Sequence, residues 1–148
     1  MNEPGLRRGI RIAASILLIA AGMHAVLHYH SYWQTSAFDE RREAIMHAMQ
    51  AYVVAPQFGT TLWTVLNMFS LAFAILLMLA GTAYWWLAKD MPATRLRPLA
   101  TASAWLCLLG ALLIAAVAPV AWGVTILFGA GCAFAWASWS GRPGRPLP

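Results

Sequence analysis

The sequence predicts an all-α integral membrane protein, a four-transmembrane-helix bundle with one short external amphipathic helix. Of the 148 residues, 61% are hydrophobic and only 10% are charged, whereas a soluble domain carries about 25% charged residues. The charged residues are also absent from three long apolar stretches, where membrane spans are expected. These observations exclude a water-soluble globular fold, a disordered chain, and a disulfide scaffold, which two cysteines cannot build.

Four segments match the roughly 20 apolar residues that a helix needs to cross the hydrocarbon. The first two lie at about 12–30 and 61–87. The third and fourth, at about 98–118 and 120–139, share one uncharged stretch that is too long for a single span. Pro119 and Gly123 mark the turn between them, because proline lacks an amide hydrogen and glycine tolerates turn geometry. We expect residues 1–148 to form a single membrane domain. A cleaved signal peptide fits the basic start of the first segment but not the length of its apolar run.

The basic residues predict the orientation, because Lys and Arg collect on the cytoplasmic side of a membrane. Eight of the ten lie at the N-terminus, after the second span and in the C-terminal tail: Arg7, Arg8, Arg11, Lys89, Arg95, Arg97, Arg142 and Arg145. The other two, Arg41 and Arg42, follow the first span. We therefore expect a multi-pass protein of a bacterial inner (cytoplasmic) membrane with both termini cytoplasmic. Topology and anionic membrane lipids explain the net charge of +5, so no nucleic-acid partner is expected.

The segment at about 36–55 predicts the external amphipathic helix. Ser36 and Asp39 resemble a capping box at its start, and Pro56 and Gly59 interrupt the chain after it. Apolar residues recur at helical spacing and form one face: Phe38, Ile45, Met46, Met49 and Tyr52, with Val53 after them. Such a helix lies on the outer surface of the bilayer, either as a plain connector or as a lid over the bundle.

Polar side chains concentrate in the outer half of the predicted bundle. His24 and His28 are four residues apart and therefore share one face of the first span. An ionisable group inside a membrane is costly and indicates function. If the first two spans form an antiparallel hairpin, equal depth brings His28 near Thr64 and His24 near Asn67, and Thr125 of the fourth span is also in the outer half. We predict a ligand pocket formed by these five residues.

Three functions and one structural role fit this pocket. A non-enzymatic protein would use it to bind a lipid-like ligand or a partner subunit. A metal- or haem-binding protein would use His24 and His28, because neutral imidazole is a common ligand. A lipid-modifying enzyme would act through His24, but we assign no catalytic residue and no cofactor, because the spans hold no Asp, Glu, Lys or Arg to pair with it. In a structural role, the histidines hydrogen-bond to Asn67, Thr64 or the backbone.

The expected partners are membrane lipids and either a second copy of the chain or a partner membrane subunit. The predicted spans carry ridges of small residues, among them Ala14, Ala21, Ala100, Ala104 and Ala137. Such ridges let helix backbones approach closely inside a bilayer, where packing rather than the hydrophobic effect drives association. They serve a compact bundle and a dimer face equally well.

Residues 22–76 resemble a family of small, uncharacterised bacterial four-span membrane proteins. The similar parts are GMHAVLH from Gly22, IMHAMQAYVV from Ile45 and GTTLWTVLNMFSLAFAILL from Gly59. The resemblance implies the four-span topology and a shared external segment, and it transfers no catalytic or binding residue. A fold-level likeness to four-helix sterol-binding membrane proteins does not extend to their intramembrane carboxylates, which have no counterpart here.

Overall fold

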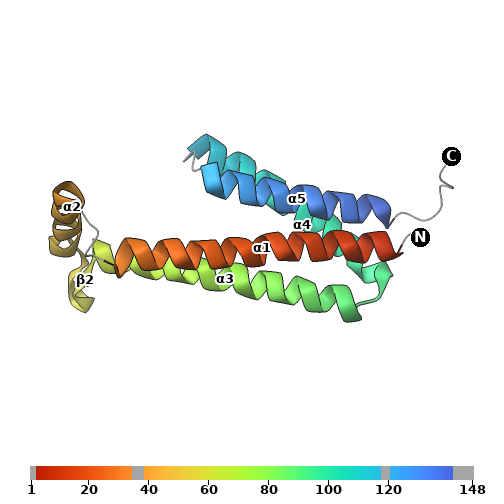
Figure 1. Cartoon of the computed structure of the whole chain (residues 1–148), viewed down its shortest axis with the longest axis horizontal. Coiled ribbons are helices and arrows are strands. Elements are labelled where there is room, and N and C mark those ends of the chain that lie inside the picture. Colours follow the sequence, from red (N-terminus) through yellow and green to blue (C-terminus); the bar gives the residue numbers. More distant parts are fainter. Residues whose placement is uncertain (1–2, 35–38, 118–120, 142–148) are drawn as a thin grey trace. The chain divides into compact units, whose positions relative to one another are not determined.

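The computed structural model describes residues 3–34, 39–117 and 121–141, which are almost entirely helical (Figure 1). In chain order the elements are α1 (Glu3–Tyr32), α2 (Glu40–Ala51), β1 (Val53–Ala55), the 3-10 helix η2 (Pro56–Phe58), β2 (Thr60–Thr61), α3 (Leu62–Asp90), α4 (Ala93–Val117) and α5 (Ala121–Ser140). The predicted all-α fold is confirmed. Among the described helices, α1, α3, α4 and α5 are each long and apolar enough to cross a membrane.

Several helix ends differ from the predicted spans. α1 begins at Glu3 rather than near Ile12, and an ion pair of 2.6 Å between Glu3 and Arg7, one turn apart, supports its first turn. α4 begins at Ala93, so Pro98 lies inside the helix instead of opening it. Gly123, predicted as a turn residue, lies inside α5. Pro119, the other predicted turn residue, lies outside the described residues, as do Ser36, Phe38, Arg142 and Arg145.

The chain divides into two compact units. The first comprises the described parts of Met1–Ala20 and Leu77–Pro148, and the second comprises the described part of Ala21–Leu76. α1 and α3 each contribute residues to both units. The expectation of a single membrane domain stays a prediction.

Small residues bring the helices of the first unit together. α4 and α5 pack along one another (Figure 1). Gly9 of α1 lies against Ala137 of α5 so closely that a Cβ added to Gly9 would stand 2.6 Å from the Ala137 Cβ. The buried core of this unit contains Leu6, Ile10, Ala13, Ala88, Ala93, Leu96, Ala100, Ala104, Phe134 and Ala137. Predicted ridge residues Ala100, Ala104 and Ala137 thus lie in this core, as expected where close backbone approach drives packing.

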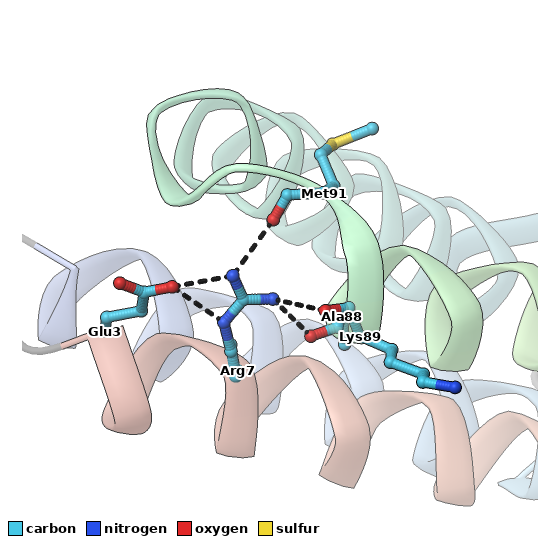
Figure 2. A network of polar contacts seen from close by, with 5 residues as sticks. All are labelled: Glu3, Arg7, Ala88, Lys89 and Met91. Atoms are coloured by element: carbon cyan, nitrogen blue, oxygen red, sulfur yellow. Dashed lines mark hydrogen bonds and ion pairs between the residues drawn. The ribbon is translucent and has the colours of Figure 1, made fainter.

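Arg7 joins the N-terminal part of α1 to the end of α3 (Figure 2). Its guanidinium donates to the carbonyl oxygens of Ala88 (2.7 Å), Lys89 (3.1 Å) and Met91 (3.2 Å), as well as to the Glu3 carboxylate. The last carbonyls of a helix have no partner within it, and a cation near them also interacts favourably with the helix dipole. Arg7, predicted from the sequence to indicate topology, is therefore also the C-terminal cap of α3.

The second unit contains the α2 segment. Asp39 is the N-cap of α2, because its Oδ1 accepts the Arg42 amide hydrogen at 2.7 Å and its backbone is extended. A helix thus exists within the predicted segment 36–55, but it begins at Glu40 and its capping residue is Asp39. Ser36, the other residue of the predicted capping box, lies outside the described residues.

A small antiparallel hairpin, which the sequence did not predict, connects α2 to α3. β1 pairs with β2 through Val53 and Thr61 and through Ala55 and Thr60. The chain turns through η2 and Gly59, which has a φ of 62°, a left-handed conformation that favours glycine. The proline and glycine expected to interrupt the chain therefore form the turn of this hairpin.

Candidate functional site

The two histidines of α1 converge on one hydroxyl group of α3. The Ser70 Oγ lies 3.0 Å from His24 Nε2 and 2.9 Å from His28 Nδ1. His28 is buried, with 6% of its surface exposed, and His24 is half-buried. The sequence predicted that His28 would lie near Thr64 and His24 near Asn67, whereas the residue of α3 that both histidines contact is Ser70.

The expected partners make different contacts. Thr64 forms a hydrogen bond of 3.0 Å with Thr61, and the Thr64 amide also donates to Thr61 Oγ1 at 3.3 Å. Thr61 directly precedes α3, so this pair caps the helix instead of meeting His28. Asn67 is half-buried, one turn before Ser70. Thr125 belongs to the first unit, where its hydroxyl donates to the Ala121 carbonyl at 2.7 Å.

The hydrogen bonds around Ser70 indicate which ring nitrogen carries the hydrogen when each imidazole is neutral. The Trp33 indole N–H can only donate, and it donates to His28 Nε2 at 3.3 Å. A neutral His28 therefore carries its hydrogen on Nδ1 and donates it to Ser70 Oγ. We infer that the Ser70 hydroxyl donates its hydrogen to His24 Nε2, so that a neutral His24 carries its own hydrogen on Nδ1. The order of donation runs from Trp33 through His28 and Ser70 to His24.

Aromatic rings extend this cluster towards α2. The His28 ring stacks on Tyr32, with ring centroids 4.9 Å apart, and Tyr32 lies 4.9 Å from the Trp63 ring. His24 meets Phe73 edge to face, at 5.0 Å between centroids. Aromatic pairs at these distances are favourable. The buried imidazole of His28 therefore supports the ring of Tyr32, and Tyr32 in turn contacts Trp63.

Tyr32 and Trp63 line a hollow of about 280 Å³, which we call the α2 hollow. Its lining comes from three helices: Ser31 and Tyr32 of α1, Arg42, Ile45, Met46 and Met49 of α2, and Trp63 of α3. Of the predicted apolar face, Ile45, Met46 and Met49 line the hollow, and Tyr52 and Val53 do not. The remaining member, Phe38, lies outside the described residues. The predicted face of α2 is thus only partly used.

The donors required by the metal alternative are not gathered in the described part of the chain. No group of three or more His, Cys, Asp and Glu side chains that could hold a metal ion occurs among residues 3–34, 39–117 and 121–141. His30 hydrogen-bonds to Gln34, and His47 lies 3.8 Å from the Glu43 carboxylate, in each case within its own helix or the residues directly after it. A metal bound between His24 and His28 would have to displace Ser70.

Sequence reasoning did not identify Ser70, although a signal for it exists. Thr64, Asn67 and Ser70 follow one another at three-residue spacing and continue one polar stripe along α3. Ser31, Tyr32, Arg42 and Trp63 were also absent from the predicted pocket, because no sequence pattern shows which side of a short external helix faces the ends of two spans. Comparison of the chain with protein-family models, with curated proteins and with solved structures found no match.

Proposed function

We propose that this protein is a non-enzymatic membrane protein that binds an amphipathic, lipid-like molecule in the α2 hollow. The observation that carries this proposal is the mixed lining of the hollow. Ile45, Met46, Met49 and Trp63 supply an apolar surface, and Ser31 and Arg42 supply polar groups beside it. Sites for small molecules have this character, with mostly apolar walls and a few placed polar groups.

The volume of the α2 hollow and the flexibility of its lining side chains indicate which part of a lipid it binds. Its volume of about 280 Å³ is just below that of ordinary ligand pockets, which run from about 300 to 1,000 Å³. It therefore holds a headgroup or the first part of an acyl chain rather than a whole lipid. The two methionines are flexible and polarisable, so they adapt to chains of different shape.

In this proposal the histidine cluster positions the wall of the hollow. His28 stacks on Tyr32 and is held from both ring nitrogens, by Ser70 and by Trp33. His28 is therefore held in place, because breaking either bond would leave a buried polar group without a partner. His24 and His28 thus act on the ligand through Tyr32, without contacting it.

The orientation that accompanies this proposal rests on the distribution of charge. With both termini cytoplasmic, α2 and its hollow face the outer side of the inner membrane, and Arg7, Arg8, Arg11 and Lys89 face the cytoplasm. A ligand then reaches the hollow from the outer leaflet or from outside the membrane.

The hydrogen bond between Ser70 and His24 favours a second candidate, acyl transfer from a lipid ester. A serine hydroxyl beside a neutral imidazole is a pairing that activates a nucleophile. Ser70 Oγ would attack the ester carbonyl, its proton would pass to His24 Nε2, and the departing alcohol would take that proton. Ligand binding is the stronger candidate, because no hydrogen bond among the described residues orients His24 from Nδ1, as the third member of a triad does.

Photo-crosslinking tests the first candidate. The probe is a lysophosphatidylcholine with a diazirine in its acyl chain, added to the purified full-length protein in detergent micelles. We expect adducts at Ile45, Met46, Met49 or Trp63. Met49→Trp fills the hollow and should lower the yield of these adducts roughly tenfold, the effect of about 1.4 kcal/mol of lost binding.

Gln50→Trp is the matched control, because Gln50 is exposed on the same helix and does not line the hollow. Its adducts should equal those of the wild type. Adducts spread evenly over the lipid-facing residues of α3, α4 and α5, and unaffected by Met49→Trp, would contradict ligand binding at this site. Labelling of Ser70 by a fluorophosphonate, lost in His24→Ala, would favour the acyl-transfer candidate instead, and an unlabelled Ser70 would remove it.

A further inference from the structure

A second hollow lies in the first unit and is lined by arginine. It has a volume of about 670 Å³, and we call it the arginine groove. Residues Glu3, Pro4, Arg7, Arg8, Arg11, Ile12 and Ser15 of α1 line it, together with Trp85 of α3. Arg8, Arg11, Ile12 and Ser15 follow the three- and four-residue spacing of one helix face. The groove therefore runs along α1 from charged residues to apolar ones.

Two of the three arginines that line the groove, Arg8 and Arg11, have no carboxylate partner in the described part of the chain. Glu3 supplies the one carboxylate of the lining, and it pairs with Arg7 at 2.6 Å. Arg7 is also committed to the three carbonyl oxygens at the end of α3 (Figure 2). The groove thus presents two guanidinium groups to an outside anion.

Trp85 orients one of these groups. The guanidinium carbon of Arg11 lies over the Trp85 ring, 6.0 Å from its centroid, and Trp85 is 44% exposed. A cation in that position is attracted by the face of the indole. The planar guanidinium still presents N–H donors at its edge, and their fork geometry matches the oxygens of a phosphate.

From this geometry we propose that the arginine groove binds the headgroup phosphate of an anionic phospholipid. Arg8 and Arg11 donate to the phosphate oxygens, Ser15 offers a hydroxyl group, and Ile12 and Trp85 contact the start of an acyl chain. The apolar end of the groove distinguishes a lipid from a free phosphate ion, which would use only the arginines. The position along α1 also fits a lipid, because the uncharged run of this membrane-length helix begins directly after Arg11.

This inference is independent of the proposed function. The α2 hollow and the arginine groove belong to different units of the chain, and they have no lining residue in common. The first takes its selectivity from size and mixed polarity, and the second takes it from charge. Comparing the binding of a zwitterionic lipid with that of an anionic lipid therefore distinguishes the two sites.

Native mass spectrometry of the purified full-length protein tests the proposal. Phosphatidylglycerol and phosphatidylcholine with the same acyl chains are titrated into detergent micelles, and bound lipid is counted. We expect phosphatidylglycerol to bind roughly tenfold more tightly than phosphatidylcholine, and Arg11→Gln to remove most of that preference, as the loss of a charge-assisted hydrogen bond does. Arg8→Gln should act in the same direction.

Arg97→Gln is the matched control, because it changes the net charge equally and Arg97 does not line the groove. Its preference for phosphatidylglycerol should stay within about twofold of the wild type. The comparison requires that Arg11→Gln keeps the helix content, measured by circular dichroism, and the midpoint of thermal unfolding of the wild type. If it does not, Trp85→Leu provides a second variant. Equal binding of the two lipids, an equal loss in Arg97→Gln, or displacement of phosphatidylglycerol by millimolar inorganic phosphate would overturn the proposal.

Discussion

At the scale of single residues, one hydroxyl group organises the polar cluster of the second unit. Ser70 Oγ lies within hydrogen-bond distance of both imidazoles, and in the inferred order of donation it accepts from His28 and donates to His24. Trp33 determines the direction, because an indole cannot accept. His28 is in this way bonded at both ring nitrogens, and His24 at Nε2, within an apolar segment where an unpaired buried polar group is costly.

The order of donation predicts the tautomers of both histidines. In the ¹⁵N NMR spectrum of the protein at neutral pH, His24 and His28 should each show a protonated Nδ1 and an unprotonated Nε2. Ser70→Ala should remove the hydrogen-bond signature from both rings and lower the free energy of unfolding by about 1–3 kcal/mol, the cost of leaving buried donors and acceptors unpaired.

His30 and His47 provide internal controls for that spectrum. Both are exposed and make their contacts outside the cluster, so Ser70→Ala should leave their resonances unchanged. A His28 ring protonated on Nε2, in the presence of an intact Ser70, would contradict the order of donation.

The site was predictable from the sequence only as far as its histidines. Two imidazoles four residues apart in an apolar span, opposite a polar stripe, were sufficient to locate the cluster. The partner residue was missed because depth was counted from predicted span ends. Moving from Asn67 to Ser70 shifts the contact of His24 by three residues, about 4.5 Å at 1.5 Å per residue. Because α1 begins nine residues before the predicted span, a depth counted from the predicted span ends could not distinguish Asn67 from Ser70.

At the scale of whole elements, the first unit depends on backbone approach between helices. Gly9 and Ala137 bring α1 and α5 together, and a Cβ on Gly9 would also stand 2.8 Å from the Ala137 Cα. We expect Gly9→Ala to lower the free energy of unfolding by about 1–3 kcal/mol, because the helices must move apart. The measurement is thermal unfolding of the purified protein in detergent.

Gly22→Ala makes the matching change elsewhere in the same helix. Nothing lies within 4 Å of the position its Cβ would take. Alanine favours a helix over glycine by up to about 1 kcal/mol, so this variant should be neutral or slightly more stable than the wild type. Equal destabilisation by the two substitutions would show that close approach at Gly9 is not what holds α1.

The elements themselves were predictable to different degrees. The four long helices follow from apolar length alone, which is the strongest signal in a membrane sequence. β1 and β2 contain three and two residues, too few for any periodic pattern to show. The cap that Arg7 places on α3 could not be predicted from the sequence for another reason. It joins residues more than eighty positions apart, and a sequence pattern shows only that the arginine is basic.

At the scale of the whole molecule, four membrane-length helices and the charge distribution together predict where each loop lies. Gln50 of α2 should be outside the cell membrane, and Thr94 at the start of α4 should be inside. In a background with Cys107 and Cys132 replaced by alanine, Gln50→Cys should react with a membrane-impermeant maleimide in intact cells. Thr94→Cys should react only after the membrane is opened. The opposite pattern would reverse the topology.

Binding of an amphipathic molecule in the α2 hollow is tested most directly by the methionine methyl groups. A deuterated protein with protonated methionine methyls, in deuterated detergent, is titrated with lysophosphatidylcholine and followed by NMR. Met46 and Met49 line the hollow, whereas Met68 and Met78 are 65% and 50% exposed on α3 and serve as references. We predict saturable shifts and direct contacts to the acyl chain for Met46 and Met49, and no saturable change for Met68 and Met78. Equal, non-saturating changes at all four methyl groups would contradict a ligand site beneath α2.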